Sequence, residues 1–180
     1  MSDDAGTAMP PSREAILVAE QLGGRALREP WRVAARCTYG FPTVIVSPSL
    51  LADGTPFPAF AWLTCPHLSE AIAAEESAGA TAAWATRAAA EPALAESLRA
   101  ADRALRAARA AESGGADACE SVGLAGQRDP LGVKCLHAHV ALALIGIQDP
   151  IGAAELGKIP SSCADGRCMT LQPTSLPRRR

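Results

Sequence analysis

The stretch Trp62-Leu63-Thr64-Cys65-Pro66 separates two kinds of sequence. Before it, short runs of β-branched or aromatic residues alternate with Gly- and Pro-containing turns, which is typical of strands. These runs cover residues 32–36, 43–47 and 60–64. Prolines between and within them restrict pairing to short or edge strands. We therefore expect a small antiparallel sheet of two or three strands that ends near Cys65.

After Pro66 the chain becomes rich in alanine, and residues 67–112 are typical of helix. Pro92 suits the first turn of a new helix, so the simplest interpretation is a helical hairpin broken at Glu91-Pro92. In its second helix, apolar residues recur at spacings of four and three and predict one buried face. This face consists of Leu94, Leu98, Ala101, Leu105 and Ala108. Charged residues on the other faces, Arg109 included, are expected to face solvent.

The remaining elements complete an α+β prediction. Ser12 can cap a first helix that Gly23-Gly24 ends, and Asp149-Pro150 marks another helix start near the end of the domain. We expect a single globular domain over residues 12–158, with flexible termini at 1–11 and 159–180. In this domain the small sheet packs against the Ala-rich helical hairpin and a further helix.

Composition narrows the classes of function. The 180 residues are 48% hydrophobic and 20% charged, with a formal net charge of -2. No broad basic surface is expected, so we predict no nucleic-acid partner. The first residues are acidic at Asp3 and Asp4, unlike a secretory signal, and no apolar run approaches the ~18 residues of a membrane span. These features predict a cytoplasmic protein without a membrane partner, whose cysteines stay reduced.

A second segment, Gly132-Val133-Lys134-Cys135-Leu136-His137-Ala138-His139, concentrates residues that can react or bind metal. Asp129-Pro130 resembles a helix start. If the helix is regular from there, Cys135 and His137 diverge by about 200° and Cys135 instead shares a face with His139. If the helix begins later, Cys135 and His137 can converge on one metal ion. The sequence leaves both alternatives open.

The cysteines and histidines predict a possible metal site. Cys37, Cys65 and Cys135 each lie at an expected element boundary, and His137 or His139 would give a fourth ligand. Such a set suits zinc, and thiolates also suit an iron–sulfur cluster. Cys163 and Cys168 lie in the polar tail, where they could add a ligand or form a disulfide with each other.

Two other classes of function remain open. Thr64 could cap the helix after Cys65, so that the helix dipole favours a Cys65 thiolate with His137 as its base, as in a cysteine-dependent enzyme. Alternatively, the protein is an interaction module that binds an unknown protein partner through the Ala-rich hairpin. Its cysteines would then only fill the core.

The chain also resembles the bacterial family named domain of unknown function 501, from about Trp31 to about Gly152. This family has no established activity, so the resemblance implies neither a reaction nor a set of ligands. The motifs that carry it are Cys37-x-x-Gly40-x-Pro42, Asp53-Gly54-Thr55-Pro56-Phe57-Pro58, Trp62-Leu63-Thr64-Cys65-Pro66-x-Leu68, Val133-Lys134-Cys135-Leu136-His137 and Pro150-x-Gly152.

Overall fold

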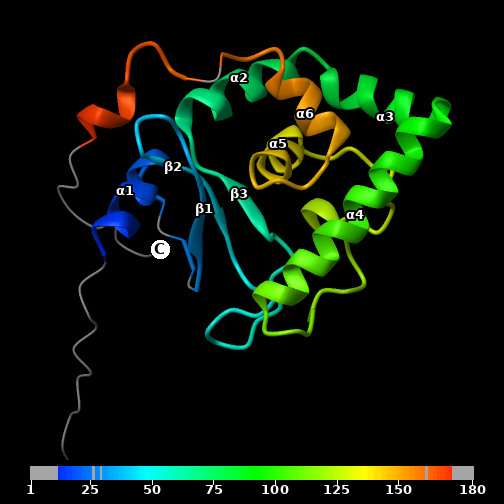
Figure 1. The fold of residues 1–180 in the computed structure, drawn as a ribbon, viewed down its shortest axis with the longest axis horizontal. Coiled ribbons are helices and arrows are strands. Elements are labelled where there is room, and N and C mark those ends of the chain that lie inside the picture. The colour runs from blue at the N-terminus through cyan, green and yellow to red at the C-terminus, as the bar shows by residue number, and fades with distance from the viewer. Residues whose placement is uncertain (1–11, 26, 29, 161, 172–180) are drawn as a thin grey trace, which may run out of the picture.

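The computed structural model describes residues 12–25, 27–28, 30–160 and 162–171. In chain order the elements are α1 (Arg13–Gln21), β1 (Arg32–Arg36), β2 (Pro42–Val46), β3 (Ala61–Leu63), α2 (Pro66–Ser77), α3 (Ala80–Ala90), α4 (Pro92–Glu112), the 3-10 helix η1 (Leu124–Gly126), α5 (Leu136–Leu144), α6 (Pro150–Leu156) and the 3-10 helix η2 (Arg167–Thr170). Helices pack around a small sheet, with α1 on one side and α4, α5 and α6 on the other (Figure 1), which confirms the α+β class.

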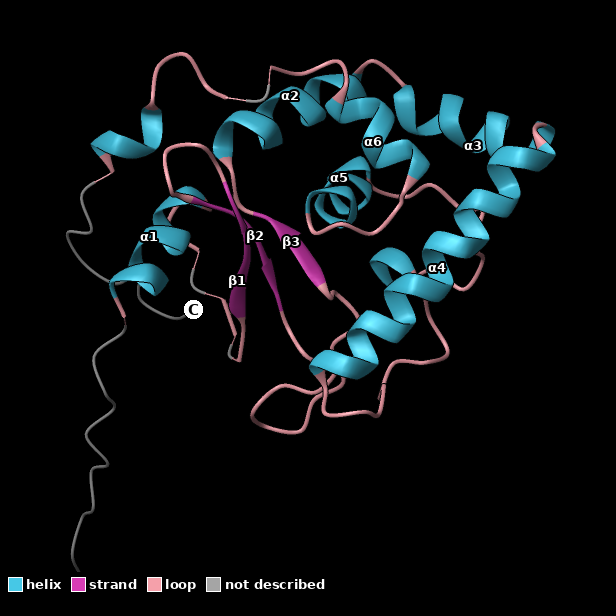
Figure 2. Cartoon of the chain, viewed as in Figure 1, coloured by secondary structure: helices cyan, strands magenta, loops and turns pink. Residues whose placement is uncertain are grey.

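The sheet has three antiparallel strands in the order β1-β2-β3 (Figure 2), as the sequence predicts. Val44 of β2 pairs with Leu63 of β3, and the register continues through Ile45 opposite Trp62. All five residues of β2 are buried, because this strand lies between two neighbours and is covered on its faces. The predicted small sheet is confirmed.

Helix α5 lies at the centre of the helical part and packs against β3, α2 and α6. Leu136, Val140, Ala141 and Leu142 are buried along it, so nearly every side of this helix faces protein. A short helix that is apolar on most sides is typical of a buried element. The main hydrophobic core forms where α5 meets Val44 and Leu63 of the sheet and Ile151 of α6.

The Ala-rich region contains three helices, where the sequence analysis expected two. The break at Pro92 is confirmed, and Leu98, Ala101 and Leu105 face the core as predicted. A second break falls at Gly79, whose φ of +90° is a left-handed conformation that favours glycine. This residue separates α2 from α3, and the Ala-rich composition on both sides of it concealed the break.

Arg109 contradicts the expected exposed face of α4, because its side chain is fully buried. Its guanidinium binds the Asp117 carboxylate at 2.8 Å and donates to the carbonyl oxygens of Pro58, Cys119 and Val122. The loop after α4 thus folds back over Arg109 and supplies acceptors for its donors. The one-sided periodicity of α4 could not indicate this, since the acceptors come from other segments.

The ends of helices α1 and α6 follow the capping signals in the sequence. Ser12 accepts the Ala15 N–H at 3.1 Å, and α1 ends before Gly23 and Gly24, as predicted. Asp149 caps α6 by accepting the Gly152 N–H at 2.8 Å, also as predicted.

None of the helices in the described residues is long and apolar enough to cross a membrane.

Candidate metal centre

The segment before α5 is a loop, which decides between the two alternatives for Cys135. Asp129 accepts the Leu131 N–H at 2.9 Å in a turn, and the Gln127 side chain donates to the Gly132 carbonyl at 3.1 Å. The helix start predicted at Asp129 is therefore wrong, because these side-chain bonds hold the backbone out of a helix. Cys135 is the N-cap of α5 with extended backbone angles (φ −154°, ψ 114°).

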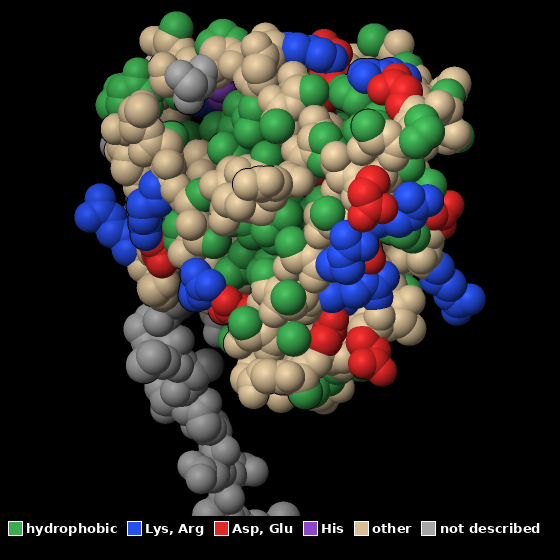
Figure 3. All heavy atoms as spheres, turned by 45° about the vertical axis from the view of Figure 1, so that its right-hand side comes forward, with side chains coloured by type: hydrophobic (Ala, Val, Ile, Leu, Met, Phe, Trp, Pro, Cys, Tyr) green, Lys and Arg blue, Asp and Glu red, His purple; other side chains and the backbone are tan. Residues whose placement is uncertain are grey.

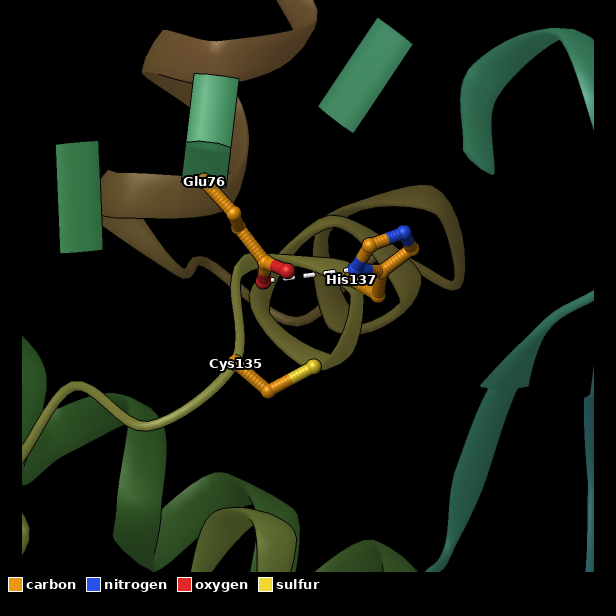
Figure 4. A group of neighbouring side chains, drawn as sticks. All are labelled: Glu76, Cys135 and His137. Atoms are coloured by element: carbon orange, nitrogen blue, oxygen red, sulfur yellow. Dashed lines mark ion pairs between the residues drawn. The ribbon is translucent and has the colours of Figure 1, made fainter. Parts of the chain in front are cut away.

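This late start brings Cys135 and His137 together with a third residue, Glu76 near the end of α2. Within the described parts of the chain, they form the one group of three or more potential metal ligands whose atoms all lie within 4.8 Å of one another. Figure 4 shows the Glu76 carboxylate and the His137 ring facing each other, with the Cys135 sulfur beside them. His137 Nδ1 lies 3.3 Å from Glu76 Oε1. All three residues are half-buried.

Neighbouring backbone groups orient two of these side chains. His137 Nε2 lies 3.0 Å from the Ser69 carbonyl oxygen, to which it can donate as an N–H. Glu76 Oε1 accepts the Leu136 N–H at 2.5 Å. Histidine ligands commonly donate their second ring N–H to a carbonyl, and carboxylate ligands are themselves hydrogen-bonded. With Nε2 engaged, Nδ1 is the nitrogen available to a metal.

The same contacts change the electrostatics of the imidazole. The hydrogen bond with Cys135 and the charge of Glu76 raise the pKa of His137 from 6.5 to about 9, against the opposing effect of burial. At neutral pH this imidazole is therefore mostly protonated, and zinc must displace its proton to bind Nδ1. The nitrogen, thiol and carboxylate together are a donor set that zinc accepts. An iron–sulfur cluster is a poorer match here, because clusters rely mainly on thiolates and only Cys135 offers one.

A cavity of about 400 Å³ adjoins Cys135 and His137. Its walls include Ser69, Phe60 and Trp62, so it is mostly apolar with a few polar groups near the site. Glu76 is not among its lining residues. The Cys135 and His137 side of the group therefore faces open space. Zinc sites with three protein ligands and one open position are typical of catalysis.

The structure does not bring all five predicted ligands together. Cys37 and Cys65 line a different cavity. Cys65 precedes α2 and Glu76 lies near the end of that helix, so ~1.5 Å per residue separates their backbones by roughly 16 Å. Thr64 does not cap α2, since its buried hydroxyl has no hydrogen-bond partner. Burial raises the pKa of the Cys65 thiol, which opposes a reactive thiolate.

His139 lies neither in the group of Glu76, Cys135 and His137 nor at the cavity that Cys37 and Cys65 line. It is buried, and its Nδ1 lies 2.7 Å from Asp149 Oδ2. The same carboxylate caps α6 through Oδ1, so His139 helps to join α5 to α6. Among the residues that the structure describes, no hydrogen-bond partner lies near its other ring nitrogen, Nε2.

Glu76 is the residue that the sequence analysis missed. It stands in a run of alanines and glutamates whose members look alike, and nothing in its immediate neighbours marks it. Its position depends on how the end of α2 packs against the start of α5. Only a long-range contact between residues 60 positions apart could have indicated it.

The fold and this group define a small α+β protein with a glutamate–cysteine–histidine cluster next to an apolar cavity. The chain matches the family model described as protein of unknown function (DUF501) over residues 33–156. It therefore belongs to this family, as its motifs suggested. No curated protein and no solved structure matches the chain.

Proposed function

We propose that this protein binds one zinc ion through Glu76, Cys135 and His137, and that the ion acts on a small molecule held in the adjoining cavity. The three residues offer oxygen, sulfur and nitrogen within 4.8 Å of one another. Tetrahedral zinc has ligand atoms separated by about 3.3–3.8 Å, given bonds of about 2.0–2.3 Å. Small rotations of these half-buried side chains reach that geometry.

The observation that supports the proposal best is the pair of outer hydrogen bonds. Ser69 accepts from His137 Nε2, and Leu136 donates to Glu76. Both partners are backbone groups, so the orientation of the ligands is built into α2 and α5. The apolar cavity supplies what an exchangeable zinc position needs, a sheltered volume with few competing polar groups.

The contact between Cys135 and His137 supports a second candidate, a cysteine-dependent enzyme. A thiolate at Cys135 paired with the protonated His137 would account for the raised pKa of the histidine. The nucleophile is then Cys135 at the start of α5, whereas the sequence analysis considered Cys65. Both candidates use Cys135 and His137. In the first a metal ion binds the Cys135 sulfur, and in the second that sulfur is free to attack a substrate.

Zinc content and thiol reactivity distinguish them. The full chain is purified without oxygen, its zinc is measured by elemental analysis, and alkylation of Cys135 by iodoacetamide is followed by mass spectrometry. We expect one zinc per chain and slow alkylation that accelerates once a chelator removes the ion. A metal-free protein that is alkylated rapidly with or without chelator contradicts zinc binding and supports the thiol enzyme.

Neighbouring glutamates provide a matched control. Glu76→Gln is expected to weaken zinc binding strongly, because an amide oxygen is a much poorer ligand than a carboxylate. Glu75→Gln should leave zinc affinity unchanged, since Glu75 pairs with Lys158 and lies outside the group. Equal zinc affinities in the two variants would show that Glu76 is not a ligand.

A further inference from the structure

Four of the six cysteines line one cavity of about 170 Å³, separate from the glutamate–cysteine–histidine group. They come from three parts of the chain. Cys37 follows β1, Cys65 precedes α2, and Cys163 and Cys168 belong to the segment after α6. Cys65, Cys163 and Cys168 are more than nine-tenths buried. All four are free thiols.

The last segment is held against this cavity by contacts from three elements. Arg167 pairs with Glu70 of α2 at 2.5 Å, and the Tyr39 hydroxyl lies 3.3 Å from the Cys163 carbonyl oxygen, to which it donates. Gln21 of α1 donates to Cys168 Sγ at 3.4 Å. Residues 162–171 therefore lie near α1 and the turn between β1 and β2 (Figure 1) and bring two thiols to the two already there.

Hydrogen-bond donors lie beside two of these sulfurs. The backbone N–H groups of His67 and Leu68, in the first turn of α2, are placed to donate to Cys65, and the Gln21 amide donates to Cys168 Sγ at 3.4 Å. Hydrogen bonds to sulfur are a regular feature of cysteine ligation of iron–sulfur clusters.

We propose that Cys37, Cys65, Cys163 and Cys168 are the four ligands of an iron–sulfur cluster. Four thiols around one cavity match the Cys₄ ligation of [4Fe–4S] clusters. The described residues contain no three of these sulfurs within 4.8 Å of one another. A single zinc requires sulfurs about 3.8 Å apart, given bonds of about 2.3 Å. A cluster places four irons between the ligands, so it accepts the wider spacing and occupies the cavity.

The test uses the full chain, purified without oxygen and reconstituted with equal amounts of ferrous and ferric iron and with sulfide. We expect a brown protein with visible charge-transfer absorption and about four irons and four acid-labile sulfides per chain. Cys37→Ser and Cys168→Ser should each lose most of the colour and iron. Cys37 follows β1 at the rim of the sheet, and Cys168 lies after α6. Circular dichroism of each variant verifies that the domain remains folded.

Two control variants make the result specific. Cys119→Ser should keep the cluster, because Cys119 contacts Ser49 and lines neither cavity. Cys135→Ser should also keep the cluster while losing zinc, so this site and the zinc site can fail separately. A colourless protein after reconstitution, zinc bound through the four cysteines, or iron retained by folded Cys37→Ser and Cys168→Ser variants would each overturn the proposal.

Discussion

The guanidinium of Arg109 shapes one wall of the cavity beside the candidate zinc site. It binds the Pro58 carbonyl, and Pro58 lines that cavity together with Leu105 and Leu124. The Asp117 carboxylate balances its charge, and both side chains are almost completely buried. A buried ion pair in which all three guanidinium nitrogens donate hydrogen bonds fixes the position of the loop after α4. The shape of the cavity therefore depends on the buried ion pair of Arg109 and Asp117.

Removing the partner of Arg109 should be costly. Asp117→Asn leaves the guanidinium buried without a counter-charge, which is expected to lower the free energy of unfolding by about 3–5 kcal/mol. Urea unfolding measures the loss. Asp53→Asn is the control, since its pair with Arg28 is more than half exposed and should contribute little to stability. Similar losses in both variants would contradict the role of Arg109.

The effect of Asp117 should also depend on pH. Burial alone would raise its pKa, but the hydrogen bonds from Arg109 and Cys119 outweigh burial and hold that pKa below 3.8. A carboxyl with a lowered folded-state pKa stabilises the fold above its unfolded value and loses this contribution as the pH falls. The difference between wild type and Asp117→Asn should therefore be largest near neutral pH and shrink below about pH 3.8.

Single residues also set the limit of what the sequence could predict about the site. Cys135 and His137 stand in one short segment, and the possibility of their convergence could be inferred from spacing alone. Glu76 could not be inferred, because its contact with Leu136 spans 60 positions and depends on the packing of two helices. Cys163 and Cys168 were expected in a flexible tail. Their burial follows from Arg167 and Tyr39, whose partners lie elsewhere in the chain.

Among the elements, those with a strong local signal were predictable. The three strands and the long helix α4 follow from alternation, turns and the spacing of apolar residues. The start of α5 could not be predicted, because Asp129-Pro130 carries the same cap signal as Asp149-Pro150. At Asp129-Pro130 a hydrogen bond from Gln127 to Gly132 keeps the backbone out of a helix. Asp149-Pro150 begins α6 as expected. Side-chain hydrogen bonds within a few residues, from Gln127 in particular, distinguished two identical Asp-Pro patterns.

The close approach of α5 and α6 depends on Gly152. A Cβ at this position would lie 2.1 Å from the His139 carbonyl oxygen, which forces the two helices apart. His139 and Asp149 connect the same helices, so the shift would disturb a buried hydrogen bond as well. We expect Gly152→Ala to lower the free energy of unfolding by about 1–3 kcal/mol, the usual cost of overpacking.

Another glycine serves as the matched control for this prediction. Gly157, at the end of α6, has a helical φ of −64°, and a Cβ there would meet no atom closer than 3.4 Å. Gly157→Ala is expected to be neutral or slightly stabilising, because alanine restricts the unfolded chain. Chemical denaturation of the two variants side by side checks the contrast. A Gly152→Ala protein as stable as Gly157→Ala would mean that the helices can separate without cost.

At the scale of the whole molecule, α2 connects the two candidate sites. Cys65 precedes its first residue and Glu76 lies near its last, so the helix carries a ligand of each site at opposite ends. The view of the molecular surface places hydrophobic side chains in the middle of one face and oppositely charged pairs along its edges (Figure 3). Many of those charges are exposed pairs within or between helices, which contribute little stability.

Zinc should stabilise the entire domain through α2 and α5. A ligand that binds only the folded state adds RT ln(1 + [L]/Kd), or about 2.7 kcal/mol at a free concentration of 100 times Kd. For a domain of this size, 1 kcal/mol corresponds to about 2–4 °C, so zinc should raise Tm by roughly 5–10 °C. Calorimetry of the full chain with zinc and with excess chelator measures this shift. Cys135→Ser should abolish it and Cys119→Ser should keep it, because Cys135 is a proposed ligand and Cys119 lies outside the group. A shift of the same size in both variants would place the stabilising zinc elsewhere in the molecule.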